Sequence, residues 1–318
     1  VCFYIVVCDF HSHHCFVFII GGSKMYCQIC PRACHAERNA ETGAGICQML
    51  ALPKVARAAL HHWEEPCISG KKGSGTIFFS GCNLHCVFCQ NYEISWQNQG
   101  KVISVAQLKK LFQNLIEQGA HNINLVNPTH YSHLLAEVLA QSWPVPIVWN
   151  SSGYESVETL RSLAGKVQIY LPDLKYADAA LAQRYAKVPD YFTVATEAIL
   201  EMQRQVGDYQ LDEQGMLQKG VLIRHLLLPG AVENTKQVIQ WVQQQFKPGQ
   251  VLFSLLAQYL PWGELQDYPE LNRKLYASEY EEAMVALFDA GIEDGFVQEL
   301  SAADDGYIPD FRLVGIEE

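Results

Sequence analysis

The chain has 318 residues, of which 49% are hydrophobic and 18% charged, with a formal net charge of −11. This length allows a large buried core, organised as two domains or as one barrel. The negative charge argues against nucleic acid or an anionic membrane as a partner, since both attract positively charged surfaces. No stretch approaches the roughly 18 apolar residues of a membrane span, so we expect a cytoplasmic protein. We also expect a monomer.

The eleven cysteines all lie between Cys2 and Cys89. A secreted disulfide protein would spread its cysteines through the fold, so this confinement favours metal ligation in a reducing compartment. Residues 1–24 are apolar and rich in Cys and His, but they lack the basic start and the cleavage site of a signal peptide. We interpret them as an upstream extension without function, followed by a Cys-rich segment at 25–75.

From residue 76 onward, strand patterns alternate with helix patterns. Strands are predicted at 76–81, 121–128, 145–153, 166–176, 221–230 and 251–259. Helices are predicted at 105–119, 131–142, 156–165, 178–186, 191–207, 233–245 and 278–291. Six strand–helix units imply a parallel sheet with functional groups at the carboxyl ends of its strands. The expected fold class is therefore α/β, with a partial (β/α)6 barrel over 76–300, a C-terminal tail at 301–318, and an open doubly wound sheet as the alternative.

The decisive motif follows the first predicted strand, in FFSGCNLHCVFCQNYEIS at 78–95. It places Cys82, Cys86 and Cys89 on one short loop, where disulfide bonds between such close neighbours would be strained. Ordinary 4Fe–4S clusters have four cysteine ligands, so three thiolates leave one iron open. An open iron is what chelation by S-adenosylmethionine (SAM) requires. We therefore predict a 4Fe–4S cluster and SAM, whose reductive cleavage gives methionine and a 5′-deoxyadenosyl radical.

A zinc site is the alternative for this loop, with His85 as the fourth ligand of a tetrahedral ion. Zinc loops rarely follow a buried strand that opens a series of strand–helix units, which makes this alternative the weaker one. An aromatic residue directly before the last cysteine, here Phe88, is also typical of radical SAM loops. We include Phe88 among the cofactor-binding residues.

On these residues the chain resembles the radical SAM superfamily, and more narrowly a group of radical SAM proteins related to the pyruvate formate-lyase activating enzyme. The resemblance covers residues 25–300 and includes CPRAC, HHWEEPCISG, GCNLHCVFCQNYEIS and PDLK. It implies a partial (β/α)6 barrel, with the cluster loop after the first strand and SAM across the carboxyl ends of the strands. It also implies an electron donor of the flavodoxin or ferredoxin type.

Two of the family's SAM-contacting segments are altered here. Where the family has Gly-Gly-Glu after the second strand, this chain has NPTH, so the resemblance leaves Asn127 and Thr129 to contact SAM through side chain or backbone. His130 is either part of the site or a solvent-facing loop residue. Where activating enzymes have Asp-Thr-Asn-Gly after the third strand, NSSG offers Asn150 and Ser152, although both are also common turn residues.

The later strands supply charged candidates. PDLK matches the family's Asp-Leu-Lys and implies that Asp173 and Lys175, on one face of an extended chain, meet SAM or substrate; a surface ion pair is the alternative. We predict both as catalytic residues and Asp173 also as a SAM contact. Arg224 aligns with an arginine directed at SAM, and a guanidinium suits a carboxylate. Gln258 or Tyr259 stands where activating enzymes have a histidine, so we expect a different substrate end.

A second set of cysteines lies upstream, with the spacing Cys27-x2-Cys30-x3-Cys34-x12-Cys47. Four thiols so close in sequence can enclose one metal site. An auxiliary Fe–S cluster, favoured by the proline in CPRAC, and a structural zinc that pins the N-terminal segment are both open, and free thiols are a third interpretation. Cys67 is a spare ligand or a small buried thiol.

A polar cluster lies between this set and the barrel. It consists of His61, His62, Glu64 and Glu65. We expect a solvated turn there rather than part of the pocket.

The predicted function is reductive SAM cleavage coupled to hydrogen-atom abstraction, an oxidoreductase-type reaction. By resemblance, the substrate is a backbone glycine of a partner protein, as in the activation of glycyl-radical enzymes. A second hypothesis is radical methylation or rearrangement of a small molecule or peptide. A third is a non-catalytic Fe–S or zinc scaffold, which a fourth cysteine ligand on the cluster would support.

Overall fold

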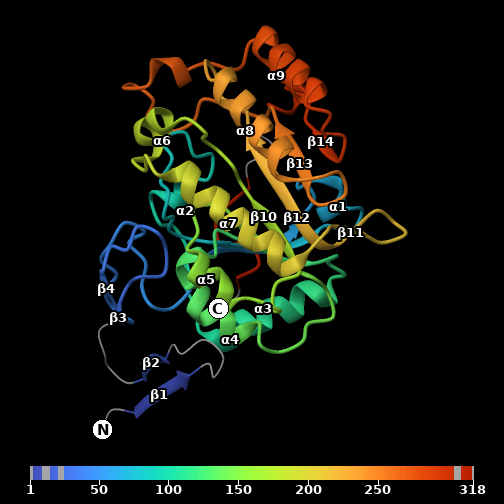
Figure 1. Ribbon diagram of the computed structural model, residues 1–318. Coiled ribbons are helices and arrows are strands. Elements are labelled where there is room, and N and C mark those ends of the chain that lie inside the picture. Colours follow the sequence, from blue (N-terminus) through green and yellow to red (C-terminus); the bar gives the residue numbers. More distant parts are fainter. Residues whose placement is uncertain (1–2, 9–14, 21–24, 304–308, 317–318) are drawn as a thin grey trace.

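A computed structural model describes residues 3–8, 15–20, 25–303 and 309–316. Its main feature is a ten-stranded sheet with the order β14-β13-β12-β10-β9-β8-β6-β5-β7 and with β11 paired to β12 (Figure 1). The strands are β5 (Lys54–His61), β6 (Ser74–Phe79), β7 (Lys101–Val102), β8 (Ile123–Val126), β9 (Ile147–Ser151), β10 (Ile169–Pro172), β11 (Gln210–Leu211), β12 (Leu217–Leu226), β13 (Leu252–Leu256) and β14 (Gly295–Val297).

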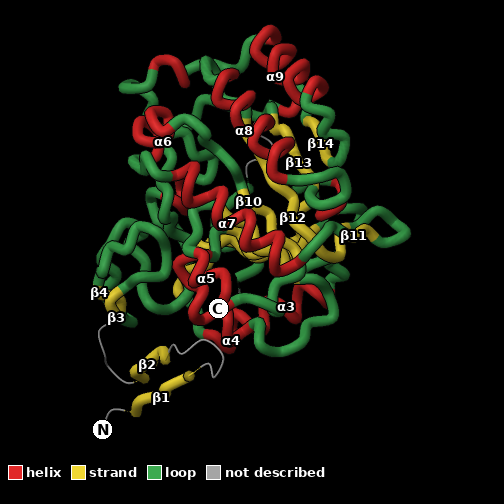
Figure 2. The backbone as a smooth tube through the Cα atoms, in the orientation of Figure 1, coloured by secondary structure: helices red, strands yellow, loops and turns green. Residues whose placement is uncertain are grey.

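Helices connect most of these strands. They are α1 (Pro66–Ser69), α2 (Tyr92–Ser95), α3 (Val105–Glu117), α4 (Ser132–Val138), α5 (Val157–Ser162), α6 (Ala179–Ala186), α7 (Tyr191–Val206), α8 (Val232–Gln245) and α9 (Ala277–Asp289), with 3-10 turns η1 (Thr129–Tyr131), η2 (Pro269–Leu271) and η3 (Leu300–Ala302). Each predicted helix is present, with its ends moved by a few residues at most positions. In Figure 2, α7 lies across β10 and β12.

The strand order confirms the partial barrel. From β6 to β14 the neighbouring strands of the sheet are parallel and follow one another in chain order. A doubly wound sheet reverses its strand order at a switch point, and this sheet has no reversal among the described residues. Since right-handed crossovers in an unreversed order put the helices on one face, the other face becomes the barrel interior, open between β14 and β7.

The central strands are buried on both faces, as expected for parallel strands covered by helices. Every residue of β9 and β10 is buried, including Trp149 and Tyr170. On the outside, α3 packs an apolar stripe against the sheet, and the buried residues of that stripe are Leu108, Leu111, Phe112 and Leu115. A capping box between Ser104 and Gln107 fixes the start of this helix. The interior face is left for polar residues of the site.

Four strands of this sheet were not predicted, the two-residue β11 among them. β5 and β7 extend the sheet beyond β6 in antiparallel orientation, and β14 adds a further parallel strand next to β13. A register irregularity between Val55 and Arg57 interrupts the in–out alternation of β5, which removes its signal of period two. β7 and β14 have two and three residues, which is too short for periodicity to detect.

Two small sheets precede the main sheet in the chain. β1 (Phe3–Cys8) and β2 (Cys15–Ile20) form a two-stranded antiparallel sheet, as do β3 (Met25–Tyr26) and β4 (Glu37–Arg38). The remainder of the predicted extension, Cys2 included, lies outside the described residues. The C-terminal tail returns to β5, where Ala58 N–H donates to the carbonyl of Val314. Across the part of the chain that the structure describes, the helices are too short or too polar to cross a membrane.

Gly153 and Gly165 offer a matched test of how the site is built into the fold. Both have positive φ, at +74° and +76°, but only at Gly153 would a Cβ meet backbone, 2.2 Å from the Asp173 carbonyl oxygen. Gly165→Ala should cost about 1–2 kcal/mol of unfolding free energy through its left-handed backbone. Gly153→Ala should cost about 1–3 kcal/mol more through overpacking. Urea denaturation of the two variants checks this, and equal losses would contradict the close contact between β9 and β10.

Candidate cluster and SAM site

A cavity of about 250 Å³ lies at the carboxyl ends of the parallel strands. Its lining includes the three cysteines of the predicted cluster loop together with Phe88, Asn127, Asn150, Ser152, Asp173, Lys175 and Arg224. These side chains come from the segments that follow β6, β8, β9 and β10, from the end of β9 and from β12 itself. The unreversed strand order brings these strand ends together, so the position of the cavity follows from the topology.

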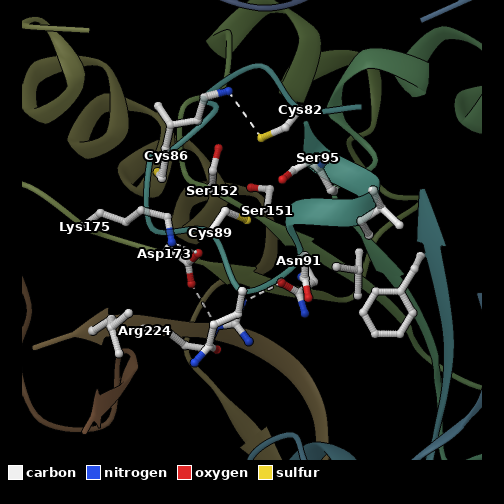
Figure 3. Close-up of a pocket in the computed structure, with 18 of the residues that line it drawn as sticks. Cys82, Cys86, Cys89, Asn91, Ser95, Ser151, Ser152, Asp173, Lys175 and Arg224 are labelled. Carbon is white, nitrogen blue, oxygen red and sulfur yellow. Dashed lines mark hydrogen bonds and ion pairs between the residues drawn. The ribbon is translucent and has the colours of Figure 1, made fainter. Parts of the chain in front are cut away.

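The cluster loop starts directly after β6. Gly81 begins it with φ +82°, in a place where a Cβ would collide with the side chain of Met49. The thiols of Cys82, Cys86 and Cys89 are free and turn toward the cavity (Figure 3). Leu84 N–H donates to Cys82 Sγ at 3.3 Å. The loop therefore presents three separate sulfurs to one space.

The environment of these sulfurs fits an Fe–S cluster. Burial raises the pKa of all three thiols, that of Cys86 to about 12, whereas the charge of Lys175 lowers each of them. Buried thiolates therefore need a strong positive partner, and bound iron supplies one. Tyr176 O–H donates to Cys86 Sγ at 3.4 Å, and hydrogen bonds to sulfur tune cluster potentials.

The zinc alternative finds no support in this loop. Among the residues that the structure describes, no group of three or more His, Cys, Asp or Glu side chains is arranged to hold a single metal ion. The ring of His85 packs instead against Trp96, with 4.8 Å between centroids. A cubane cluster is wider than one ion and takes each thiolate on a different iron, so its ligands need not converge on a point.

A buried ionic network crosses the floor of the cavity. Arg224 donates from Nε to Asp173 Oδ1 at 3.1 Å, from Nη1 to Glu64 Oε2 at 3.0 Å and from Nη2 to Asn150 Oδ1 at 2.6 Å. The Glu64 Oε1 atom accepts from Asn124 and Asn150, both at 3.2 Å. A guanidinium has five N–H donors, so Arg224 keeps donors for a ligand after these contacts.

Lys175 connects the network to the cluster loop. Its Nζ donates to Asp173 Oδ2 at 2.6 Å, and its charge reaches all three cluster cysteines. Burial alone would lower the pKa of Lys175, but the Asp173 carboxylate reverses that effect and raises it. For Asp173, burial is outweighed by Lys175 and Arg224, which lower its pKa. Both groups are therefore charged at neutral pH.

The predicted SAM contacts divide into two groups. Asn127, Asn150 and Ser152 line the cavity with Phe88, whereas Thr129 does not. The Thr129 side chain is buried and donates to Glu155 Oε1 at 2.7 Å. Asn127 adopts φ +59° and its backbone N–H donates to the Asn150 carbonyl at 2.8 Å. The roles of all these residues toward SAM stay predictions.

Burial changes the interpretation of two sequence positions. Of the two alternatives for His130, the solvent-facing one does not hold: the side chain is buried, its Nε2 lies 2.7 Å from the Ser80 carbonyl, and burial lowers its pKa to about 3. The HHWEEP turn is not fully solvated either, because Glu64 and Glu65 point into the barrel interior. Two adjacent glutamates carry no mark of burial in a sequence; Arg224 within an apolar strand was the signal that a carboxylate had to meet it.

At the substrate end the structure distinguishes the two candidates. Gln258 lines the cavity, whereas Tyr259 is buried and donates its hydroxyl proton to the Leu271 carbonyl at 2.8 Å. Gln258 Oε1 accepts from Gln298 at 3.2 Å, next to β14. The unpredicted strand β14 thus contributes to this end of the site.

The comparisons with known proteins agree with this geometry. Residues 76–242, just over half of the chain, match the model of the radical SAM superfamily. The chain belongs to the radical SAM superfamily. Membership implies a 4Fe–4S cluster and SAM as cofactors, cleavage of SAM to a radical, and a need for an electron donor. An uncharacterized protein of Methanocaldococcus jannaschii is 30% identical over 269 residues, which are 81% of this chain and 73% of the relative.

Solved structures of radical SAM enzymes are similar at low identity. A mutant of spore photoproduct lyase with a dinucleoside spore photoproduct has 12% identity and a TM-score of 0.47, over 73% of this chain and 78% of that one. SuiB of Streptococcus suis bound to the precursor peptide SuiA has 14% identity and a TM-score of 0.44, over 69% of this chain and 46% of SuiB. This chain thus spans about half of SuiB. A domain of pyruvate-formate lyase-activating enzyme from Bacteroides vulgatus has 14% identity and a TM-score of 0.35, over 61% of this chain and 91% of that domain. The narrower relation to activating enzymes stays a prediction.

Glu65 and Asp173 should give opposite dependences of stability on pH. Burial raises the pKa of Glu65, so the stability from this group is present below its unfolded pKa of about 4.3 and is lost as the pH rises through its folded pKa. Glu65→Gln, which mimics the neutral acid, should therefore become more stable than the wild type as the pH rises. Asp173 has a lowered pKa, so its contribution is present above about pH 3.9 and is lost as the pH falls.

Asp173→Asn should accordingly lower the unfolding free energy at neutral pH and approach the wild type only in acid. Urea denaturation at a series of pH values from about 2 to 8 measures both differences. Differences of the same sign for Glu65→Gln and Asp173→Asn at neutral pH would contradict the charge assignment of the network.

Proposed function

We propose that this protein cleaves SAM reductively and uses the radical to abstract a hydrogen atom from a substrate held in the same cavity. The carrying observation is that three free cysteines and a buried network of Arg224, Asp173 and Glu64 line one cavity at the strand ends. When bound, the cluster and SAM supply one-electron cleavage of a carbon–sulfur bond. The rest of the reaction depends on how the protein's residues bind and orient SAM and the substrate and shield them from water.

The proposed roles follow from charge. SAM carries a carboxylate and an amino group, and the free donors of Arg224 suit the carboxylate. The carboxylate of Asp173, between Arg224 and Lys175, suits the amino group. Asn150, held by Arg224 and Glu64, and Ser152 supply polar contacts to ribose. Phe88, 5% exposed, adds an apolar wall that excludes water.

The substrate end holds buried polar atoms without partners. Trp63, Glu64, Glu65 and Gln298 line a second cavity that also reaches Ser254 and Arg224. Glu65 Oε2 and Gln298 Oε1 are buried without a hydrogen-bond partner in the described part of the chain. Because burial raises the pKa of Glu65, its neutral acid offers an O–H donor as well as an acceptor, while Gln298 Oε1 offers an acceptor. Such a site favours a ligand with both N–H and C=O groups, as a peptide backbone has, which supports a protein or peptide substrate.

This supports the activating-enzyme type of reaction, an oxidation of a peptide by hydrogen abstraction, over the methylation or rearrangement of a small molecule. We propose a one-electron donor of the flavodoxin or ferredoxin type as the second partner. The donor is required because reductive cleavage of SAM consumes one electron in each event.

Anaerobically reconstituted protein with dithionite should convert SAM to 5′-deoxyadenosine and methionine. Cys86→Ala should abolish this conversion because it removes a cluster ligand. Cys67→Ala is the matched control, since Cys67 is a buried free thiol outside the cavity lining, and it should retain the conversion. Chromatography of both products measures the result. No 5′-deoxyadenosine with any reductant or candidate peptide would refute the proposed function.

Lys175 should set the ease of cluster reduction. Loss of a positive charge beside the cysteines disfavours the incoming electron, so Lys175→Met should make the cluster's midpoint potential more negative, on the order of tens of mV. Lys247→Met is the control because Lys247 is exposed and far along the chain after α8. Redox titration followed by electron paramagnetic resonance measures both. An unchanged potential in Lys175→Met would show that its charge does not act on the cluster.

A further inference from the structure

We propose that Cys27, Cys30, Cys34 and Cys47 form the binding site of a second Fe–S cluster, a cubane with four cysteine ligands. These thiols are free, and three of them are buried, at 4%, 9% and 7% exposure for Cys27, Cys30 and Cys47. The SAM cavity uses none of them. The site lies in the segment of β3 and β4, beside α5 (Figure 1), where Thr159 O–H donates to the Ile29 carbonyl at 2.6 Å.

The backbone folds the four cysteines into one compact unit. Cys27 N–H donates to the Ala36 carbonyl at 2.9 Å and His35 N–H to the Cys27 carbonyl at 3.0 Å, while Gln48 N–H donates to the Gly45 carbonyl at 3.1 Å. A Cβ on Gly45 would lie 3.0 Å from Cys34 Sγ and 2.7 Å from the Ala36 Cβ. The chain thus passes as bare backbone beside the sulfurs, which requires glycine at that point.

The backbone around these cysteines adopts energetically unfavourable conformations. Ala33, His35 and Gln48, which flank Cys34 and Cys47, have positive φ of 39°, 48° and 55°. Non-glycine residues in this region cost of order 1–3 kcal/mol each and persist where the surroundings hold them, often around ligands. A short loop that turns its sulfurs inward needs such turns.

A buried arginine supplies charge compensation. Arg38 is 1% exposed and donates to three backbone carbonyls, those of Met49, His130 and Leu50. Its Nη1 also lies 3.7 Å from Cys27 Sγ. No carboxylate contacts this guanidinium among its recorded partners in the described chain. A cluster bound by four thiolates carries net negative charge, and a buried cation beside a sulfur stabilises it.

The site is tied directly to the first cluster loop. Arg32, two residues after Cys30, donates to the carbonyls of Asn83 at 2.8 Å and Leu84 at 3.3 Å. Both carbonyls belong to the loop between Cys82 and Cys86. Arg32 also donates to the carbonyls of Ala186 and Lys187, at 2.9 and 3.0 Å. One side chain thereby fixes the CPRAC loop against the loop that carries the radical SAM cysteines.

A cluster fits this set better than one zinc ion. Zinc holds four thiolates tightly, at about 2.3 Å from one centre, and no described group of side chains converges in that way. The loop of Cys82, Cys86 and Cys89, in a family that binds a cubane, likewise forms no group arranged around a single ion among the described residues.

Metal analysis of the full chain tests this inference. The triple variant Cys82→Ala, Cys86→Ala, Cys89→Ala removes the first cluster, and after anaerobic reconstitution it should retain about four irons and four sulfides per chain. Its reduced electron paramagnetic resonance signal should be unchanged by SAM, since no iron is open. Adding Cys30→Ser and Cys47→Ser should remove this iron, whereas adding Cys67→Ser, the matched buried thiol, should not.

The wild type provides a measurement that does not depend on the folding of the triple variant. It should bind about eight irons and eight sulfides per chain. One zinc without sulfide at the second set, or only four irons in the wild type, would overturn the inference. Neither result would affect the proposed cleavage of SAM, which the first cluster alone carries out, so the two proposals fail separately.

Discussion

The buried guanidinium of Arg224 is the interaction on which the site depends. It lies inside the barrel on β12 and links Asp173 after β10, Asn150 at the end of β9 and Glu64 after β5. Four segments that are distant in sequence are therefore joined through the charged guanidinium of Arg224. Removal of one member would leave the others buried and uncompensated, which costs about 3–5 kcal/mol for such a pair. The network thus couples the shape of the cavity to the stability of the barrel, and Lys175 extends it to the cluster loop.

Much of this arrangement follows from the sequence. The six central strands and their helices are predictable because buried β-branched runs and helical spacing alternate with clear turn residues. Once the strands are parallel and in order, their carboxyl ends must meet, so segments such as PDLK and NSSG are brought together. The three-cysteine loop is predictable for a chemical reason, since its ligand set leaves one iron open. Here fold, ligand chemistry and topology agree with one another.

The rest depends on contacts that a linear pattern does not record. β5 escapes prediction because its irregular register breaks the alternation of Val55 and Arg57, and β14 because it is so short. Glu64 and Glu65 look like a solvated turn until the buried charge of Arg224 requires partners from outside its own strand. Thr129 shows the opposite case: the family resemblance names it as a possible SAM contact, but its side chain is buried and donates to Glu155 Oε1. Side-chain direction at a strand end is set by packing, which sequence spacing alone does not fix.

Two arginines of the Cys-rich segment contribute to the electrostatics of the barrel. Arg32 and Arg38 both spend most of their donors on backbone carbonyls, so neither is neutralised by a carboxylate in those contacts. Positive charge thereby lies behind the cysteine loops, whereas the acidic side chains Glu64 and Glu65 line the second cavity. The positive charge stabilises a negative cluster, because buried charges act strongly in a low local dielectric. The segment that begins at Cys27 therefore contributes to the electrostatics of the site, and its Arg32 holds the first cluster loop in place.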